Sequence, residues 1–309
     1  MHILITGGTG FIGRNVMADF LKRSSETSFA ALVHPGGSIP AKNGKFSPER
    51  VEYLRDLREI KTRPAVLIHL AGSPVFRMRP FFENTRKIRE SRGPYTGKLF
   101  RELATAGLLP DTIIMAGSTG FYSPSRIPVP ETTSPGTTFP ALLAQEWENA
   151  ASETLAELLR DGIIPRLPRL ITLRFSAVMG RDGGFLKPFM LMKHAPVLIP
   201  GAGDICISWI SIQDTTEIIW KMIQEWPDFT GAVNLAVPKP LSVNEICREI
   251  AKINRGIFTL HIPAGLIRFM KPKTADFILL SNTARPGVLT DKLGYRFLWE
   301  DFGAFLNSL

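Results

Sequence analysis

The sequence predicts an α/β fold, in which a doubly wound parallel sheet is followed by a smaller, mostly helical C-terminal part. Short apolar runs rich in β-branched residues alternate with longer amphipathic stretches over the first 180 residues, as expected of successive βαβ units. A turn with several glycines separates the first run from the first amphipathic stretch. Beyond Gly180 the alternation loosens and Gly and Pro become frequent, which indicates a change of architecture.

Five short apolar runs are predicted as strands. They are His2–Thr6, Phe29–His34, Ala65–Leu70, Thr112–Met115 and Leu170–Phe175. Three amphipathic stretches are predicted as helices, because their apolar residues recur at helical spacing. They are Ile12–Leu21, Asn84–Ala106 and Leu142–Leu159. Gly93-Pro94 should bend or break the second, because proline lacks an amide hydrogen and clashes with the preceding turn.

The later part of the chain divides into two kinds of segment. Residues 183–204 are predicted as loop with a short helix, after which a strand, a helix and a strand return to the sheet: Ile205–Ile210, Thr215–Gln224 and Ala232–Val237. Ser242 and Glu245 have the spacing of a capping box and begin a mostly helical tail. We therefore expect a sheet domain of residues 1–180 and 205–237, and a smaller substrate or cap domain of residues 181–204 and 238–309. A substrate cleft should lie between them.

Composition limits the classes of partner and location. The 309-residue chain has 37 Lys and Arg against 28 Asp and Glu, a formal net charge of +9, which raises the question of a polyanionic partner. No stretch approaches the length of uncharged apolar residues that crosses a membrane. Cys206 and Cys247 lie far apart and the N-terminus lacks the features of a signal peptide, so a cytoplasmic location is expected. The five histidines are dispersed, and no metal site is predicted.

The glycine-rich turn predicts binding of a dinucleotide. It has the spacing Gly7-x-x-Gly10-x-x-Gly13 and lies between a predicted strand and a predicted helix. Gly7 permits a tight turn, Gly10 lets the backbone approach a pyrophosphate, and Gly13 lets the helix pack close to the strand. The helix N-terminus adds a partial positive charge. A glycine turn without a ligand is the alternative.

Several motifs together resemble one branch of the extended short-chain dehydrogenase/reductase superfamily. The glycine-rich turn and His69-Leu70-Ala71-Gly72 are similar to the superfamily as a whole. The branch is indicated by Trp147-Glu148, Gly183-Gly184-Phe185-Leu186, Pro196 with Gly201 and Gly203, Trp209-Ile210-Ser211-Ile212-Gln213-Asp214, and a tail from Leu279-Leu280-Ser281 through Arg285-Pro286 to Leu293-Gly294-Tyr295-Arg296-Phe297. This branch is the "NAD-dependent epimerase/dehydratase family", also described as cell-division-inhibitor-like nucleoside-diphosphate-sugar epimerases. The resemblance implies a Rossmann-type NAD(P)-binding domain and a short helical C-terminal domain.

The resemblance also implies which residues bind the cofactor. They are Gly7, Thr9, Gly10, Phe11, Ile12, Gly13, Leu70, Ala71, Gly72 and Ser176. The strand Phe29–His34 ends without the acidic residue that would repel a 2′-phosphate, and Lys42 and Lys45 follow it. This favours NADP over NAD, with His34 near the phosphate; an exposed loop residue is the alternative for His34. Asp56 resembles the acidic residue that meets the adenine amino group, with an ordinary surface charge as the alternative.

The catalytic set of the superfamily is incomplete in this chain. Its usual base is a Tyr whose pKa is lowered by a Lys four residues later, yet none of the four tyrosines has a Lys at that spacing. The segment Phe139–Ala150, which resembles the Tyr/Lys helix, contains neither residue type. Ser118 remains as the residue that would hold a substrate carbonyl, or else as a turn residue that bonds to local backbone. Tyr122 is a second catalytic candidate, or else a wall residue.

Basic residues concentrate between positions 77 and 101. They are Arg77, Arg79, Arg86, Lys87, Arg89, Arg92, Lys98 and Arg101, opposed only by Glu83 and Glu90. A solvated helix face, a clamp on an anionic substrate and a nucleic-acid surface are the three interpretations. Ser91-Arg92 resembles a pair frequent in the family, so Arg92 is the substrate-binding candidate, together with Trp209. No nucleic-acid module accompanies the charge, and nucleic acid is the least favoured partner.

Two functions are therefore predicted as alternatives. The first is an NAD(P)-dependent epimerase or oxidoreductase that acts on a carbonyl or sugar substrate, nucleotide-linked or small. The second is a dinucleotide-binding regulatory or scaffold protein that has lost the chemistry. Both require the cofactor, and only the first requires turnover.

Overall fold

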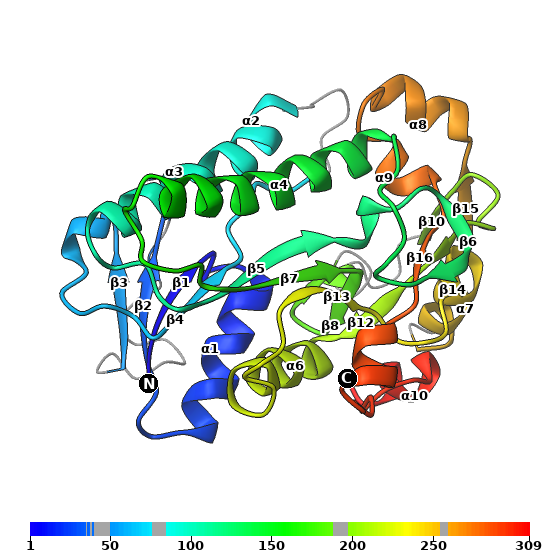
Figure 1. Ribbon diagram of the computed structural model, residues 1–309. Coiled ribbons are helices and arrows are strands. Elements are labelled where there is room, and N and C mark those ends of the chain that lie inside the picture. Colours follow the sequence, from blue (N-terminus) through cyan, green and yellow to red (C-terminus); the bar gives the residue numbers. More distant parts are fainter. Residues whose placement is uncertain (35, 38, 40–49, 76–84, 188–196, 254–258) are drawn as a thin grey trace.

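A seven-stranded parallel sheet forms the centre of the protein (Figure 1). The computed structural model describes residues 1–34, 36–37, 39, 50–75, 85–187, 197–253 and 259–309. The strand order is β13-β7-β5-β4-β1-β2-β3, and every neighbouring pair is parallel. The strands are β1 (His2–Thr6), β2 (Ser28–Leu32), β3 (Val51–Leu54), β4 (Val66–His69), β5 (Thr112–Ser118), β7 (Arg169–Phe175) and β13 (Gly231–Leu235). The predicted α/β fold with a doubly wound parallel sheet is thereby confirmed.

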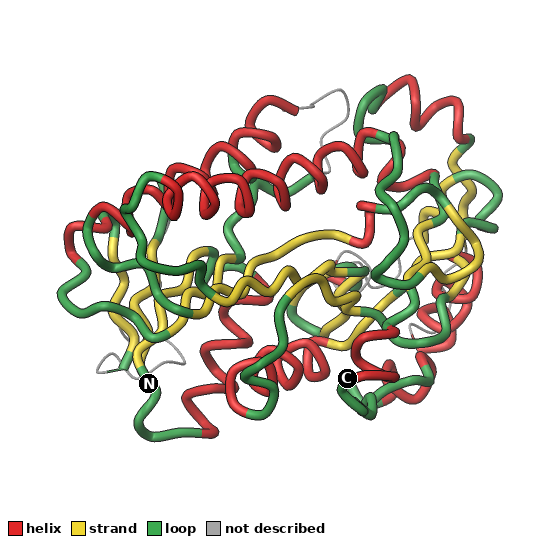
Figure 2. Tube along the Cα trace, viewed as in Figure 1, coloured by secondary structure: helices red, strands yellow, loops and turns green. Residues whose placement is uncertain are grey.

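Helices cover both faces of this sheet (Figure 2). One face carries α1 (Phe11–Arg23) and α6 (Ile212–Gln224), and the other carries α3 (Gly93–Thr105) and α4 (Phe139–Arg160). The strands are apolar on both sides for this reason. In β1, Ile3 and Ile5 pack towards α1 and α6, whereas Leu4 packs towards α3 and α4.

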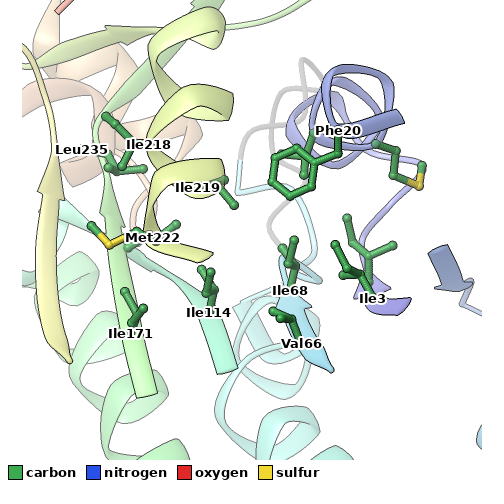
Figure 3. Close-up of a cluster of buried hydrophobic side chains, with 14 of the residues drawn as sticks. Ile3, Phe20, Val66, Ile68, Ile114, Ile171, Ile218, Ile219, Met222 and Leu235 are labelled. Atoms are coloured by element: carbon green, nitrogen blue, oxygen red, sulfur yellow. The ribbon is translucent and has the colours of Figure 1, made fainter. Parts of the chain in front are cut away.

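The core beneath α1 and α6 is built from interlocking aliphatic side chains (Figure 3). Phe20 of α1 and Ile219 and Met222 of α6 are fully buried over Ile68 and Ile114 of the central strands. This packing fixes α1 against the sheet, because close-packed cores resist displacement.

The predicted helix Asn84–Ala106 is two helices within its described part, α2 (Thr85–Glu90) and α3. Pro94 lies in the first turn of α3, where its missing amide hydrogen costs no helical hydrogen bond. The expected break at Gly93-Pro94 is therefore confirmed, and it places Ser91 and Arg92 at the junction.

The remaining elements form a smaller part beside the C-terminal ends of the main strands (Figure 1). Three small sheets contain β6 (Ser125–Val129), β11 (Cys206–Ile207), β14 (Leu241–Ser242) and β16 (Asn282–Ala284); β8 (Ala177–Gly180), β9 (Gly183–Gly184) and β12 (Trp209–Ser211); and β10 (Val197–Pro200) and β15 (Thr259–Ile262). The helices of this part are α7 (Val243–Ile253), α8 (Ala264–Met270), α9 (Asp276–Leu279) and α10 (Phe302–Asn307). Short 3-10 or π-helical turns lie at Thr119–Phe121 and Val288–Lys292, and at Leu57–Glu59 between β3 and β4 of the main sheet. None of the described helices combines the length and apolar character needed to cross a membrane.

The predicted strand Ile205–Ile210 does not return to the main sheet. It divides into β11 and β12, which belong to different small sheets. Ser208 lies between them, and its backbone N–H and side chain bond to β16 instead. By contrast, Ala232–Val237 does contribute β13 to the main sheet, and the capping box of Ser242 and Glu245 forms at α7 as predicted.

A buried carboxylate ties the C-terminal segment to α6. Asp214 is fully buried and accepts hydrogen bonds from the Tyr295 hydroxyl at 2.8 Å, the Leu298 amide at 2.7 Å and the Ser211 hydroxyl at 2.6 Å. Burial and the adjacent Asp214 charge raise the pKa of Tyr295, so its hydroxyl stays protonated and donates. Through Asp214, the motif from Trp209 to Asp214 therefore holds the C-terminal segment around Tyr295 and Leu298 against α6.

We predict that Tyr295→Phe lowers the free energy of unfolding by about 1.5–3 kcal/mol, since it removes one hydrogen bond to a buried charge. Urea unfolding of the purified chain measures this loss. Tyr53→Phe is the matched control, because the Tyr53 hydroxyl is buried without a hydrogen-bond partner among the described residues and its removal should cost nothing. Equal losses in the two variants would contradict the stated role of Asp214.

Candidate functional site

The glycine-rich turn brings two backbone segments into close contact. Gly7 has φ +73°, and a β-carbon there would lie 2.7 Å from the carbonyl carbon of Leu70. A β-carbon on Gly13 would lie 2.4 Å from the carbonyl oxygen of Gly7. Only glycine fits at these two positions, because real β-carbons do not approach other atoms so closely.

The N-terminus of α1 is open beside this turn. Gly10 is its N-cap residue and no side chain caps the helix, so the first amide groups of the helix point to the exposed surface near Thr9 and Gly10. Uncapped amides at the start of a 13-residue helix suit an anion such as a pyrophosphate.

Phe11 and Arg14 close one side of the turn. The Phe11 ring packs on Gly183 and Gly184, where added β-carbons would lie 2.1–2.8 Å from a backbone or ring atom. Phe11 thus joins the turn to the β8–β9 hairpin, while Ile12 is half-buried. Arg14 lies over the Phe11 ring at 5.6 Å and donates to the carbonyl oxygen of Asp182. Sequence reasoning missed Arg14, although its place one residue after Gly13 in the first helical turns could have indicated it.

A buried row of polar side chains holds the loop that follows β4. Trp147 Nε1 donates to Thr96 Oγ1 at 2.9 Å, and this oxygen lies 2.9 Å from His69 Nε2. His69 Nδ1 in turn lies 2.7 Å from Thr6 Oγ1, which accepts from the Ala71 amide at 3.2 Å. Burial lowers the pKa of His69 to about 4, so the imidazole is neutral near neutral pH. The row links α3 and α4 to the predicted cofactor loop at Leu70, Ala71 and Gly72.

Ser91 and Arg92 hydrogen-bond to the backbone of Ser73, the next residue of the same loop. Ser91 Oγ accepts from the Ser73 amide at 2.8 Å, and Arg92 Nη1 donates to the Ser73 carbonyl at 3.2 Å. The Arg92 guanidinium lies over Trp147 at 5.2 Å and next to Gly72. Burial lowers the pKa of Arg92 to about 10, and no carboxylate of the described residues pairs with it.

Most of the described basic stretch is neutralised by carboxylates. Its ion pairs are Arg86–Glu90, Arg89–Glu146, Lys98–Glu102 and Arg101–Glu157. Two of these acids belong to α4, which sequence counting within residues 77–101 could not include. The described part of the stretch is thus a salt-bridged helix surface with Arg92 as its exception, and Arg77, Arg79 and Glu83 lie outside the described residues.

Ser118 lies at the C-terminal end of β5. Its Oγ accepts a hydrogen bond from the Gly120 amide at 3.0 Å, the local bond expected of a turn residue, and its hydroxyl donates to no described residue. Pro140 of α4 packs beside Gly120, and it supplies no acid or base. Ser176 Oγ donates to the Leu235 carbonyl at 2.5 Å.

Tyr122 does not have the environment of a catalytic acid or base. It is 4% exposed, its hydroxyl donates to Asn234 Oδ1 at 2.7 Å, and it accepts from Arg174 Nη1 at 2.8 Å. Burial raises its pKa. Arg174 is itself paired with Glu148 at 2.8 Å. The prediction of Tyr122 as a catalytic residue is therefore wrong, because both hydrogen-bonding directions of its hydroxyl are used inside the protein.

Trp209 is likewise not a substrate-binding residue. It is fully buried and packs against Phe302 and Phe305, with ring centroids 5.0 and 5.5 Å away. The prediction that it contacts substrate is wrong, because its side chain fills the core of the smaller part.

His34 and Asp56 lie at the predicted adenosine end. His34 is exposed, and its Nδ1 accepts from the Gly36 amide at 3.1 Å. Asp56 caps the turn Leu57–Glu59, and hydrogen bonds from Arg58 lower the pKa of its carboxyl to about 2. Both side chains make local hydrogen bonds, and His34 is exposed whereas Asp56 is half-buried. Their contacts with a cofactor therefore stay predictions. Lys42 and Lys45 lie outside the described residues.

His69 should make stability depend on pH. Its pKa is about 6.5 in the unfolded chain and about 4 in the folded protein, so between these values the unfolded chain binds more protons. We predict that the contribution is present above pH 6.5 and falls by roughly 3 kcal/mol as the pH decreases towards 4. Urea unfolding across this range, with His69→Gln as the comparison, isolates the effect. Identical pH profiles for the two proteins would contradict it.

Comparison with known proteins places this geometry in a family. The model of the NAD dependent epimerase/dehydratase family matches residues 3–236. The chain is 26% identical over 316 residues to "Epimerase family protein SDR39U1 homolog, chloroplastic" of Arabidopsis thaliana, covering 97% of this chain and 84% of that protein. The crystal structure of human epimerase family protein SDR39U1 with NADPH has a TM-score of 0.79 at 21% identity, covering 100% of this chain and 98% of the other. MoeE5 in complex with UDP-glucose and NAD has a TM-score of 0.76 at 20% identity, covering 99% and 96%. The chain belongs to the NAD dependent epimerase/dehydratase family.

Proposed function

We propose that this protein binds NADPH along the C-terminal edge of its main sheet and acts as an oxidoreductase or epimerase on a carbonyl or sugar substrate. The observation that carries the proposal is the uncapped start of α1, which faces a turn where Gly7 and Gly13 leave no room for side chains. An anion of the size of a pyrophosphate suits the open amides there.

The preference for NADP over NAD rests on the end of β2. Val33 and His34 follow this strand, and no carboxylate stands there to repel a 2′-phosphate. The crystal structure of the similar human epimerase family protein SDR39U1 is one with NADPH. In this proposal His34 lies near the 2′-phosphate, Asp56 near the adenine, and Arg14 beside the pyrophosphate.

The substrate would lie between the ends of β4 and β5 and the smaller part. A bound nicotinamide supplies a hydride donor or acceptor in such a site. Ser118 would hold the substrate oxygen through its free hydroxyl proton, and Ser176 would contact the nicotinamide amide. Arg92, buried without a carboxylate from the described residues, would attract an anionic group of the substrate. In this proposal residues 1–180 and 205–237 form the cofactor domain, and residues 181–204 and 238–309 lie on the substrate side. The proposed location is the cytoplasm.

A regulatory, dinucleotide-binding protein is the second candidate function. It is favoured by the absence of any Tyr-x-x-x-Lys in the sequence and by Pro140, which packs beside Gly120 in the turn after Ser118 and supplies no acid or base. Both functions share the cofactor. They differ in whether a panel of carbonyl and sugar compounds changes the nicotinamide absorbance, and whether Ser118→Ala abolishes that change.

We predict that Gly10→Asp weakens NADPH binding roughly a hundredfold or more, because its carboxylate would lie against the pyrophosphate. Aspartate is also a good N-cap residue, so the variant should keep the thermal stability of the wild type. Titration of NADPH by fluorescence measures the dissociation constant.

Gly265→Asp is the matched control for this variant. Gly265 has no atom within 4 Å of its added β-carbon and lies in α8, away from the turn. Its dissociation constant for NADPH should equal that of the wild type. A wild-type protein that binds neither NADPH nor NADH would overturn both candidate functions.

A further inference from the structure

Trp147 is the buried contact between α4 and the side chains that support the loop after β4. The helix α4 contains no Tyr and no Lys, so neither of these residue types joins it to the candidate site. Trp147 is 5% exposed, and its ring lies under the Arg92 guanidinium at 5.2 Å and edge to face with His69 at 6.4 Å. Its indole Nε1 donates to Thr96 Oγ1 at 2.9 Å. This indole is therefore where α4 meets the polar row of Thr96, His69 and Thr6.

Both ends of the polar row are groups that can only donate. The indole N–H of Trp147 and the backbone N–H of Ala71 bond to Thr96 Oγ1 and Thr6 Oγ1 respectively. His69 lies between these two oxygens, with Nε2 2.9 Å from Thr96 Oγ1 and Nδ1 2.7 Å from Thr6 Oγ1. A neutral imidazole donates with one nitrogen and accepts with the other. His69 is therefore satisfied only while both hydroxyls stay in place, and an unmade bond is costly because all three side chains of the row are fully buried.

The Trp147 indole keeps the Thr96 hydroxyl directed at His69. A Thr hydroxyl within a helix commonly bonds to the carbonyl oxygen three or four residues earlier. In α3 the Thr96 hydroxyl instead faces Trp147 and His69, and it bonds to no carbonyl of the described residues. Without the indole N–H, this hydroxyl could turn to its own helix and leave His69 Nε2 without a partner.

The middle of the loop after β4 depends on the other end of the row. Ser73 is held by Ser91 and Arg92, and the Leu70 amide bonds to the Thr6 carbonyl oxygen at 3.0 Å. Between these anchors, the Ala71 amide bonds to the Thr6 side chain at 3.2 Å. A change in the bonding of Thr6 therefore reaches the loop at Ala71.

We propose that Trp147 is a positioning residue for the cofactor, which holds the loop Leu70–Gly72 through Thr96, His69 and Thr6. This inference rests on the proposed function, because it takes the loop as part of the NADPH site. A loop that is already ordered binds its ligand more tightly than one that must be ordered on binding. In this way α4 strengthens cofactor binding although none of the row's side chains needs to touch the cofactor.

The first test compares two Trp→Phe variants. Trp147→Phe keeps an aromatic ring under Arg92 and removes the indole N–H. It should weaken NADPH binding about three- to tenfold, the range expected for one lost hydrogen bond. Trp220→Phe is the matched control, because Trp220 also has an arginine over its ring, Arg23 at 5.7 Å, but packs on the opposite face of the sheet. Its dissociation constant should equal that of the wild type. Titrations are made at a temperature where thermal unfolding shows every variant to be folded.

Variants of Thr96 test the route of the effect. Thr96→Val removes the hydroxyl at nearly constant shape and should weaken NADPH binding as much as Trp147→Phe does. Thr96→Ser keeps the hydroxyl and should bind NADPH nearly as well as the wild type. Because Trp147 acts through Thr96, adding Trp147→Phe to Thr96→Val should weaken binding no further. Two independent packing effects would add instead.

Magnetic resonance of the cofactor-free, ¹⁵N-labelled chain tests the same row without NADPH. Trp147→Phe and Thr96→Val should each change the imidazole ¹⁵N shifts of His69, which report the bonding of its two nitrogens. Both variants should also speed hydrogen exchange of the Ala71 amide. Trp220→Phe should alter neither signal.

The outcomes separate this inference from the proposed function. If the wild type binds NADPH and Trp147→Phe binds it equally well, the inference is wrong and the proposed function stands. Additive losses in the double variant, or an unchanged exchange rate of the Ala71 amide, overturn the inference as well. A wild type that binds no NADPH overturns the proposed function, and the role of Trp147 in cofactor binding fails with it.

Discussion

The candidate site depends on a backbone contact that excludes side chains. Gly7 meets the carbonyl group of Leu70 so closely that a methyl group would overlap it, and this contact brings the end of β1 against the end of β4. The buried hydroxyl of Thr6 then bonds both His69 and the Ala71 amide. The glycine-rich turn and the loop after β4 are therefore one rigid unit, because moving either would break a contact or leave a buried polar group unpaired.

Sequence patterns predict the features that local interactions along the chain determine, namely the main strands, the helices and the glycine-rich turn. Apolar periodicity located the main strands and helices, since both faces of the sheet are buried and their composition follows from that burial. Gly7 and Gly13 were identified because their spacing has a steric cause. Trp209 and Tyr122 were misassigned because a motif fixes a residue's place in the chain without stating whether its side chain faces the core or the cleft. Ile205–Ile210 was misread because Ser208 interrupts it through bonds to β16, a partner more than 70 residues away.

The charge of the chain illustrates the same limit of sequence patterns, which do not show contacts between segments distant in the sequence. Counting within residues 77–101 gave a strong local excess, but Glu146 and Glu157 of α4 lie beside Arg89 and Arg101. Exposed pairs of this kind contribute little to stability, yet they remove the local field that would attract a polyanion. Arg92 differs because it is buried beside Trp147, with no carboxylate partner in the described part of the chain. A cation in that condition retains most of its attraction for an anion, since the dielectric around it is low and water screens it poorly.

The loss of a titrating base has a consequence for the chemistry that this fold can support. A Tyr with a lowered pKa both polarises a carbonyl and exchanges its proton, whereas in the proposed site Ser118 could only polarise, because its hydroxyl does not ionise in the range where proteins work. Burial of His69 and the engagement of Tyr122 leave neither of them free for proton transfer at that position. In the proposed site, neither of these two residues can then supply a proton to a substrate oxygen beside Ser118. Such a site would favour substrates whose carbonyl carbon is already electrophilic, because a fixed donor lowers the barrier in proportion to the charge that develops on the oxygen.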